Sequence, residues 1–64
     1  MKVGITIDTS SRSIYERRLT QVGYKIVSIT PLDADTELLK VETKNVEALA
    51  EVLKGAMEEV RKSS

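Results

Sequence analysis

A chain of 64 residues with ten basic and ten acidic side chains has room for one domain, over residues 1–64, and carries no net charge. The absence of cysteine and histidine excludes disulfides, thiolate nucleophiles and the commonest general base and metal ligand. Its 41 % hydrophobic and 31 % charged residues fit a folded domain without a membrane span, so we expect a cytoplasmic protein that is not an enzyme.

Residues 2–8 alternate between apolar and polar side chains, which predicts a half-buried strand with Val3, Ile5 and Ile7 on its inward face. Helical spacing follows and ends at Gly23, a residue that favours the left-handed conformation at a helix end. Ser13 and Glu16 have capping-box spacing, with Ser10 and Ser11 as alternative caps. The predicted apolar face of this helix consists of Ile14, Tyr15, Leu19 and Val22.

Two further strands are predicted over residues 24–32 and 37–44, and the polar turn between them, residues 33–36, favours an antiparallel hairpin. Apolar residues lie on both faces of the first of these strands, and Pro31 marks its end or an edge position. Asn45 is a good cap for a final helix, which has the strongest apolar periodicity in the chain. The periodic residues are Val46, Leu49, Ala50, Leu53, Ala56, Met57 and Val60.

The order β-α-β-β-α predicts an α+β fold with two layers. If the third strand pairs between the first two, the three-stranded sheet has order 1-3-2 and both helices cover one face. The first strand is then an edge with unpaired backbone groups. The predicted core residues are Ile5, Ile7, Leu39, Val41, Leu49, Leu53 and Met57.

The residue inventory predicts no catalytic group, no cofactor and no metal site. Asp33 and Asp35 are too few ligands for a cation, and the polar segment 8–11 has the composition of a helix cap, with an anion site as the alternative. Residues 1–31 hold five basic and two acidic side chains, whereas residues 32–64 hold five basic and eight acidic ones. The candidate phosphate contacts are Arg12, Arg17, Arg18 and Lys25. With only two aromatic residues, a stacking surface for single-stranded RNA is poorly supplied.

The final helix also carries a second flank of mostly small residues beside its core stripe. Because glycine costs a helix interior about 1 kcal/mol relative to alanine, Gly55 indicates a close approach of another backbone or chain. This flank predicts a partner interface formed by Ala48, Val52, Gly55 and Glu59. The edge of the first strand is the alternative contact, and a wide core stripe would explain the same pattern without a partner.

The run from Thr36 to Val60 resembles the small dimerisation subunit of the KEOPS complex, which makes threonylcarbamoyladenosine on tRNA in archaea and eukaryotes. Ala48-Leu49 matches an Ala-Leu pair that opens the family's final helix, and the apolar positions that follow also match. The chain departs from the pattern at Ala50, where the family usually has Arg, and at Lys54-Gly55, where Asn-Ser is usual. The shorter archaeal paralogue of that subunit is the alternative match.

This resemblance implies a non-catalytic subunit that acts in dimerisation and complex assembly. Its partners would be a second copy or a related small subunit, together with the kinase-like catalytic subunit, and tRNA would be engaged within the complex. The missing Arg puts any tRNA contact through Ala50 in doubt. The alternative function is a small ferredoxin-like regulatory or ligand-binding module with its site at Gly4 and segment 8–11.

Overall fold

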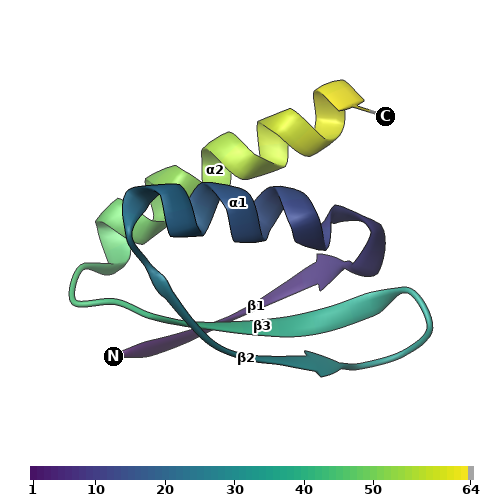
Figure 1. The fold of residues 1–64 in the computed structure, drawn as a ribbon, viewed down its shortest axis with the longest axis horizontal. Coiled ribbons are helices and arrows are strands. Elements are labelled where there is room, and N and C mark those ends of the chain that lie inside the picture. The colour runs from purple at the N-terminus through teal and green to yellow at the C-terminus, as the bar shows by residue number, and fades with distance from the viewer. Residues whose placement is uncertain (64) are drawn as a thin grey trace.

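The computed structural model describes residues 1–63 and has the predicted order of elements. Three strands form one antiparallel sheet in the order β1-β3-β2, and both helices lie on one face of it (Figure 1). The elements are β1 (Lys2–Asp8), the 3₁₀ turn η1 (Thr9–Ser11), α1 (Arg12–Val22), β2 (Lys25–Pro31), β3 (Thr36–Glu42) and α2 (Val46–Ser63). The predicted two-layer α+β fold is therefore confirmed.

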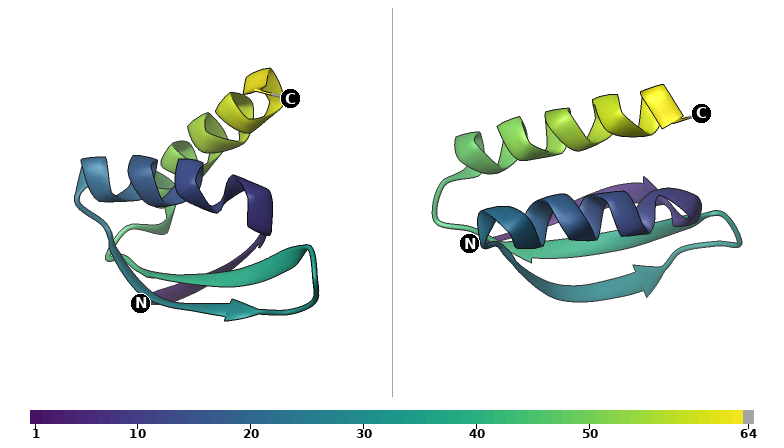
Figure 2. Two further views of the ribbon diagram at one scale, coloured as in Figure 1. Left: turned by 45° about the vertical axis from the view of Figure 1, so that its right-hand side comes forward. Right: turned by 45° about the horizontal axis from the view of Figure 1, so that its top comes forward.

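The two helices cover different parts of the sheet. In Figure 1, α1 lies in front with β2 and β3, while α2 lies behind it on the side of β1, and Figure 2 shows the same arrangement from two further directions. The C-terminal half of α2 rises away from the sheet (Figure 2). Neither helix within residues 1–63 has the length and apolar character needed to cross a membrane.

The two outer strands pair with β3 in different ways. β1 runs in regular register from Lys2 opposite Glu42 to Asp8 opposite Thr36. β2 has a bulge, because Ile26 pairs with Val41 but Ser28 pairs with Lys40, which leaves Val27 as an extra residue. The bulge turns both Ile26 and Ile29 toward the core and leaves Val27 38 % exposed. It accounts for the apolar residues on both faces of this strand.

Turns and caps at the element ends are partly as predicted. Gly23 has a φ of 104° and ends α1 in the left-handed conformation, donating its N–H to the carbonyls of Leu19 and Thr20. The Asn45 side chain accepts the N–H of Ala48 at 3.2 Å and caps α2. At the start of α1, the capping box at Ser13 is wrong, because Ser13 lies inside the helix. The alternative, Ser11, is at the cap position after the turn η1, but makes no side-chain capping bond.

The core lies between the sheet and the inner faces of the helices. Its buried apolar residues are Ile7, Tyr15, Leu19, Leu39, Val41, Leu49 and Ala56, with Ile5 and Leu53 partly buried beside them. The placement of Met57 in the core is wrong, since this residue is 56 % exposed, whereas its neighbour Ala56 is 1 % exposed. Val22 is also outside the core, 61 % exposed at the end of α1.

Candidate functional site

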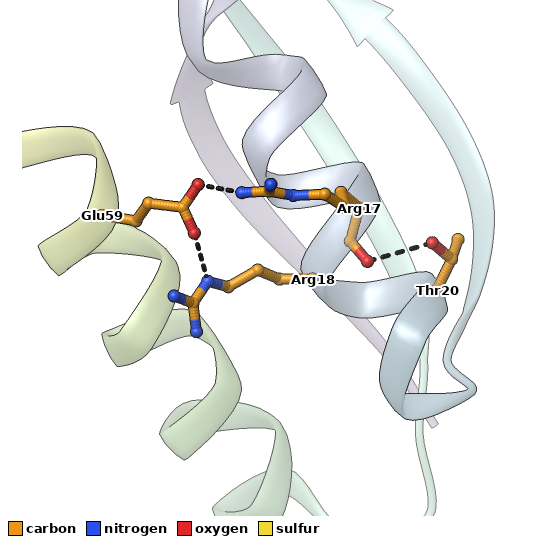
Figure 3. Close-up of polar contacts among 4 residues, drawn as sticks. All are labelled: Arg17, Arg18, Thr20 and Glu59. Carbon is orange, nitrogen blue, oxygen red and sulfur yellow. Dashed lines mark hydrogen bonds and ion pairs between the residues drawn. The ribbon is translucent and has the colours of Figure 1, made fainter. Parts of the chain in front are cut away.

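The first polar cluster joins the two helices through one carboxylate. Glu59 of α2 forms ion pairs with Arg17 and with Arg18 of α1, and the Arg18 Nε lies 2.7 Å from Glu59 Oε1 (Figure 3). On α1, the Thr20 hydroxyl donates to the Arg17 carbonyl at 3.1 Å (Figure 3). Two guanidinium groups share one carboxylate, so the cluster keeps one net positive charge.

Gly55 lies one turn before Glu59 and faces the same arginine. A Cβ atom at this position would lie 3.1 Å from Arg18 Nη1, closer than most Cβ contacts, so the glycine leaves room for the guanidinium. Gly55 and Glu59 thus contact α1 of the same chain. The other two members of the predicted interface differ, because Val52 packs against the core and Ala48 is exposed. We call the side of α2 that carries these four residues the α1-facing flank, after the two that contact α1, Gly55 and Glu59.

The four candidate phosphate contacts do not form a continuous free surface. Arg12 Nη1 lies 3.3 Å from Glu37 Oε2, and its Nε lies 3.8 Å from Glu16 Oε1. Arg17 and Arg18 are held by Glu59. Lys25, at the start of β2, is exposed and makes no ion pair within residues 1–63.

Glu37 is a buried carboxylate that the sequence interpretation missed. It lies opposite Ile7 on the inward face of the sheet, and its side chain is 8 % exposed. One oxygen accepts a hydrogen bond from Arg12, while Oε1 has no partner within residues 1–63. The signal was the period of two in β3, which turns Glu37 to the same face as Leu39. Within residues 1–63 no three acidic side chains come together as metal ligands.

Tyr15 of α1 is a buried phenol in the core. Burial raises the pKa of the Tyr15 hydroxyl above its usual value of 10.0, and the negative charge of Asp8 raises it further. No nucleophile or general base is paired with Tyr15 in the hydrogen bonds of residues 1–63. We therefore assign Tyr15 a packing role.

The two loop segments considered as ion sites are used for turns. The Asp33 carboxylate accepts the N–H groups of Asp35 and Thr36 at 2.8 and 2.9 Å, and these bonds lower its pKa below the usual value. In segment 8–11, the Thr9 N–H donates to the Asp35 carbonyl. A shallow groove beside Ser10 and Ser11 runs between the start of α1 and the end of α2, with Ile14 and Val60 along it.

The strongest candidate for a binding surface is the free edge of β1. The N–H of Thr43 donates to the Met1 carbonyl and that of Thr9 to the Asp35 carbonyl, so the odd-numbered residues of this segment bond to β3. The even-numbered residues therefore direct their backbone N–H and C=O groups away from the sheet. These residues are Lys2, Gly4, Thr6 and Asp8.

An apolar stripe on α2 accompanies this edge. Val46, Ala50, Leu53 and Met57 are spaced by four, three and four residues and share the flank opposite the α1-facing one. Val46 is 44 % and Met57 56 % exposed, and Leu53 is only partly buried. We call these four residues the open flank of α2, because α1 covers the other side.

Comparison with known proteins adds no homologue to this description: no protein-family model matches the chain, and neither a curated protein nor a solved structure matches it significantly.

Proposed function

We propose that this chain is a non-catalytic assembly subunit that binds a second protein chain along the free edge of β1 and the open flank of α2. The observation that carries the proposal is the regular, unpaired edge of β1 beside exposed apolar residues of α2. Extended segments add to such edges through main-chain hydrogen bonds, and neighbouring apolar side chains supply further binding energy.

The other edge of the sheet lacks these properties. The N–H of Leu32 donates to the Thr36 carbonyl, so the even-numbered residues of β2 bond to β3. The backbone groups of Ile29 and Pro31 therefore point away from the sheet. Proline has no N–H to offer a partner strand, and the bulge at Val27 interrupts the rest of the edge. A partner that adds a strand therefore has one regular edge available, at β1.

The assembly we propose is a KEOPS-like, tRNA-modifying complex, on the strength of the resemblance in residues 36–60. In that assembly the chain binds a small subunit, identical or related, and the kinase-like catalytic subunit. Contact with tRNA phosphates would fall to Lys25 and to the one uncompensated charge of the Arg17, Arg18 and Glu59 cluster. Since three of the four candidate phosphate contacts are held in ion pairs, we expect the isolated chain to bind tRNA weakly and in a salt-dependent manner.

The test is co-purification of the full chain with the kinase-like catalytic subunit of an archaeal KEOPS complex, followed by size-exclusion chromatography with light scattering. We expect a stoichiometric complex that contains two small subunits. Thr6→Pro removes an outward N–H without touching the β1–β3 bonds and should abolish the small-subunit pair, whereas the control Thr6→Val keeps the N–H and should not. A chain that never enters such a complex would contradict the tRNA-modifying role.

The alternative function, a small ligand-binding module, makes a different prediction in the same samples. It expects a monomer whose melting temperature rises with phosphate, bound at Ser10 and Ser11 beside the groove. A monomer with phosphate-dependent stability would favour this alternative over the assembly role.

A further inference from the structure

We infer that Met57 is a site of reversible oxidation by peroxide, and that its sulfoxide form opposes the binding of a partner at the open flank of α2. The inference rests on the proposed function and adds a means of regulating the same surface. The atom concerned is the thioether sulfur of Met57, which belongs to the apolar stripe of Val46, Ala50, Leu53 and Met57.

The residue inventory directs oxidation chemistry to methionine. The sequence holds no cysteine, histidine or tryptophan, and its only sulfur atoms are those of Met1 and Met57. Methionine is oxidised to the sulfoxide, and methionine sulfoxide reductases return it to the thioether. Met1 precedes β1, so Met57 is the one methionine that belongs to a helix flank.

Met57 is accessible to a small oxidant in the free chain. The residue is 56 % exposed, whereas Ala56 beside it is 1 % exposed. Hydrogen peroxide can therefore reach this position without any opening of the fold. The sulfur gives an electron pair to one peroxide oxygen, the O–O bond breaks, an S=O bond forms and water leaves. The sulfur is oxidised by two electrons and the peroxide is reduced by two.

Oxidation at this position changes the surface of α2 and leaves its core face unchanged. The buried residues of α2 are Leu49 and Ala56, which contain no sulfur. A sulfoxide on the exposed Met57 stays in contact with water, so the folded monomer bears little cost.

A complex that covers the open flank places the sulfoxide in a different environment. The polar S=O group must then give up its water, and its neighbours in the stripe have no side-chain group that can donate a hydrogen bond. These neighbours are Val46, Ala50 and Leu53. We expect oxidation to weaken binding about tenfold or more.

Binding and oxidation also exclude one another. A partner that covers the open flank keeps peroxide away from the Met57 sulfur, so the unassembled chain is oxidised faster than the bound one. Peroxide therefore prevents new assembly and spares complexes that have already formed. Reduction of the sulfoxide returns the free chain to the binding-competent form.

The first experiment measures the affinity of the chain for the kinase-like catalytic subunit of an archaeal KEOPS complex by calorimetry, before and after treatment with hydrogen peroxide. Peptide mass spectrometry gives the extent of oxidation at Met1 and at Met57. We expect binding at least tenfold weaker once Met57 is oxidised, and recovery after treatment with methionine sulfoxide reductases. An oxidised chain that binds as tightly as the reduced one overturns the inference.

Three variants assign the effect to Met57. Met57→Leu keeps an apolar helix former without sulfur, so its binding should match the native chain and resist peroxide, while oxidation of Met1 controls for the dose. Met57→Gln has a permanent polar group and should bind about tenfold more weakly without peroxide. Val22→Gln, at a 61 % exposed position of α1, is the matched control and should not affect binding. A Met57→Leu chain that loses binding after peroxide overturns the inference.

The second experiment separates an effect on binding from an effect on folding. Circular dichroism and the melting temperature of the oxidised free chain should match those of the reduced chain, because Met57 is exposed. A saturating amount of the catalytic subunit should slow the oxidation of Met57 about tenfold. An oxidised chain that unfolds, or an oxidation rate that is equal in the free and bound chains, contradicts the inference.

These outcomes distinguish the inference from the proposed function. A reduced chain that binds no partner refutes the assembly role, and the inference falls with it. A reduced chain that binds, and whose affinity does not depend on the oxidation of Met57, refutes the inference and leaves the assembly role standing.

Discussion

The two long sides of this small domain differ in how far the chain itself covers their apolar and hydrogen-bonding groups. On one side, α1 covers a flank of α2, the Glu59 carboxylate binds two arginines, and the β2 edge ends in a bulge and a proline. On the other side, β1 runs in regular register to its edge, and Val46 and Met57 of α2 are exposed. The chain completes the first side by itself and leaves apolar and hydrogen-bonding groups unused on the second.

The two flanks of α2 show that the size of the residues on a helix flank does not tell which part of the molecule packs against it. The flank with Gly55 has the small residues expected of an interface between proteins, but its close neighbour is Arg18 of the same chain. The opposite flank, with Leu53 and Met57, has the large side chains expected of a core and is half exposed. Small residues on a helix indicate that another group approaches closely, here a side chain of the same chain. Large apolar residues that stay exposed indicate a surface that a partner can bury.

The largest expected effect distinguishes two leucines of α2. Leu49 is 0 % exposed, so Leu49→Ala should lower the free energy of unfolding by about 2–5 kcal/mol. Leu53 is partly buried on the open flank, so Leu53→Ala should lower the free energy of unfolding of the monomer by less than half as much. Denaturant unfolding at low protein concentration measures both. Equal losses would show that the open flank is as well packed as the core.

The second prediction concerns the buried carboxylate. Arg12→Met leaves Glu37 without its cation, with Oε1 already lacking a partner, and should destabilise the fold by about 1–3 kcal/mol. Adding Glu37→Leu removes the uncompensated charge and should recover most of the loss. Chemical denaturation of the single and double variants tests this. A double variant no more stable than Arg12→Met would disprove the charge explanation.

The third prediction tests the contact that closes the α1 side. Glu59→Gln removes the charge that Arg17 and Arg18 share, and we expect a loss of about 0.5–1 kcal/mol in low salt that shrinks in high salt. Glu58→Gln, at an exposed position on the same helix, is the control and should change stability little. Thermal melts at two ionic strengths give the comparison, and equal effects of the two variants would count against a role for the cluster.

A smaller effect is expected from Gly55→Leu. Leucine is the better helix former by about 0.8 kcal/mol, but its side chain would displace the Arg18 guanidinium and weaken the bond to Glu59 by a similar amount. Stability should therefore change little, and binding of a partner at the β1 edge should persist, because the substitution lies on the α1-facing flank. Loss of partner binding with an intact fold would place the interface on that flank.

The last prediction concerns the stability of the fold at alkaline pH, which depends on the ionisation of Tyr15. Because burial and the Asp8 charge raise the pKa of Tyr15 in the folded state, the contribution of this residue is full below pH 10.0 and is lost as the pH rises above it. Tyr15→Phe should flatten the alkaline decline in stability. Unfolding curves between neutral and strongly alkaline pH measure it, and an unchanged decline would assign it to other groups.

Local patterns were sufficient to predict most of the fold. The period of two placed β1, the cap at Asn45 and the left-handed Gly23 bounded the helices, and the hairpin with the helical crossover fixed the sheet order. The bulge at Val27 and the 3₁₀ entry to α1 have no pattern of comparable strength. Both depend on how the chain accommodates its neighbours in three dimensions.

The candidate sites were less predictable, because they depend on pairs of elements. Arg18 and Glu59 are 41 residues apart, and only the crossing of the helices brings them together. The apolar arc of α2 spans more than one face, and only the packing of the helix on the sheet decides that Leu49 and Ala56 are buried while Met57 is not. Glu37 followed the alternation of its strand, but its polarity concealed its inward position.

The interrupted edge of β2 has a consequence for how far association can proceed. When a partner strand adds at β1, β2 remains the outer edge of this chain, where Pro31 offers no donor and the bulge at Val27 breaks the alignment of the backbone. A further chain would then find no regular strand to extend on this side of the sheet. We therefore expect Val27 and Pro31 to limit edge-to-edge association at β2.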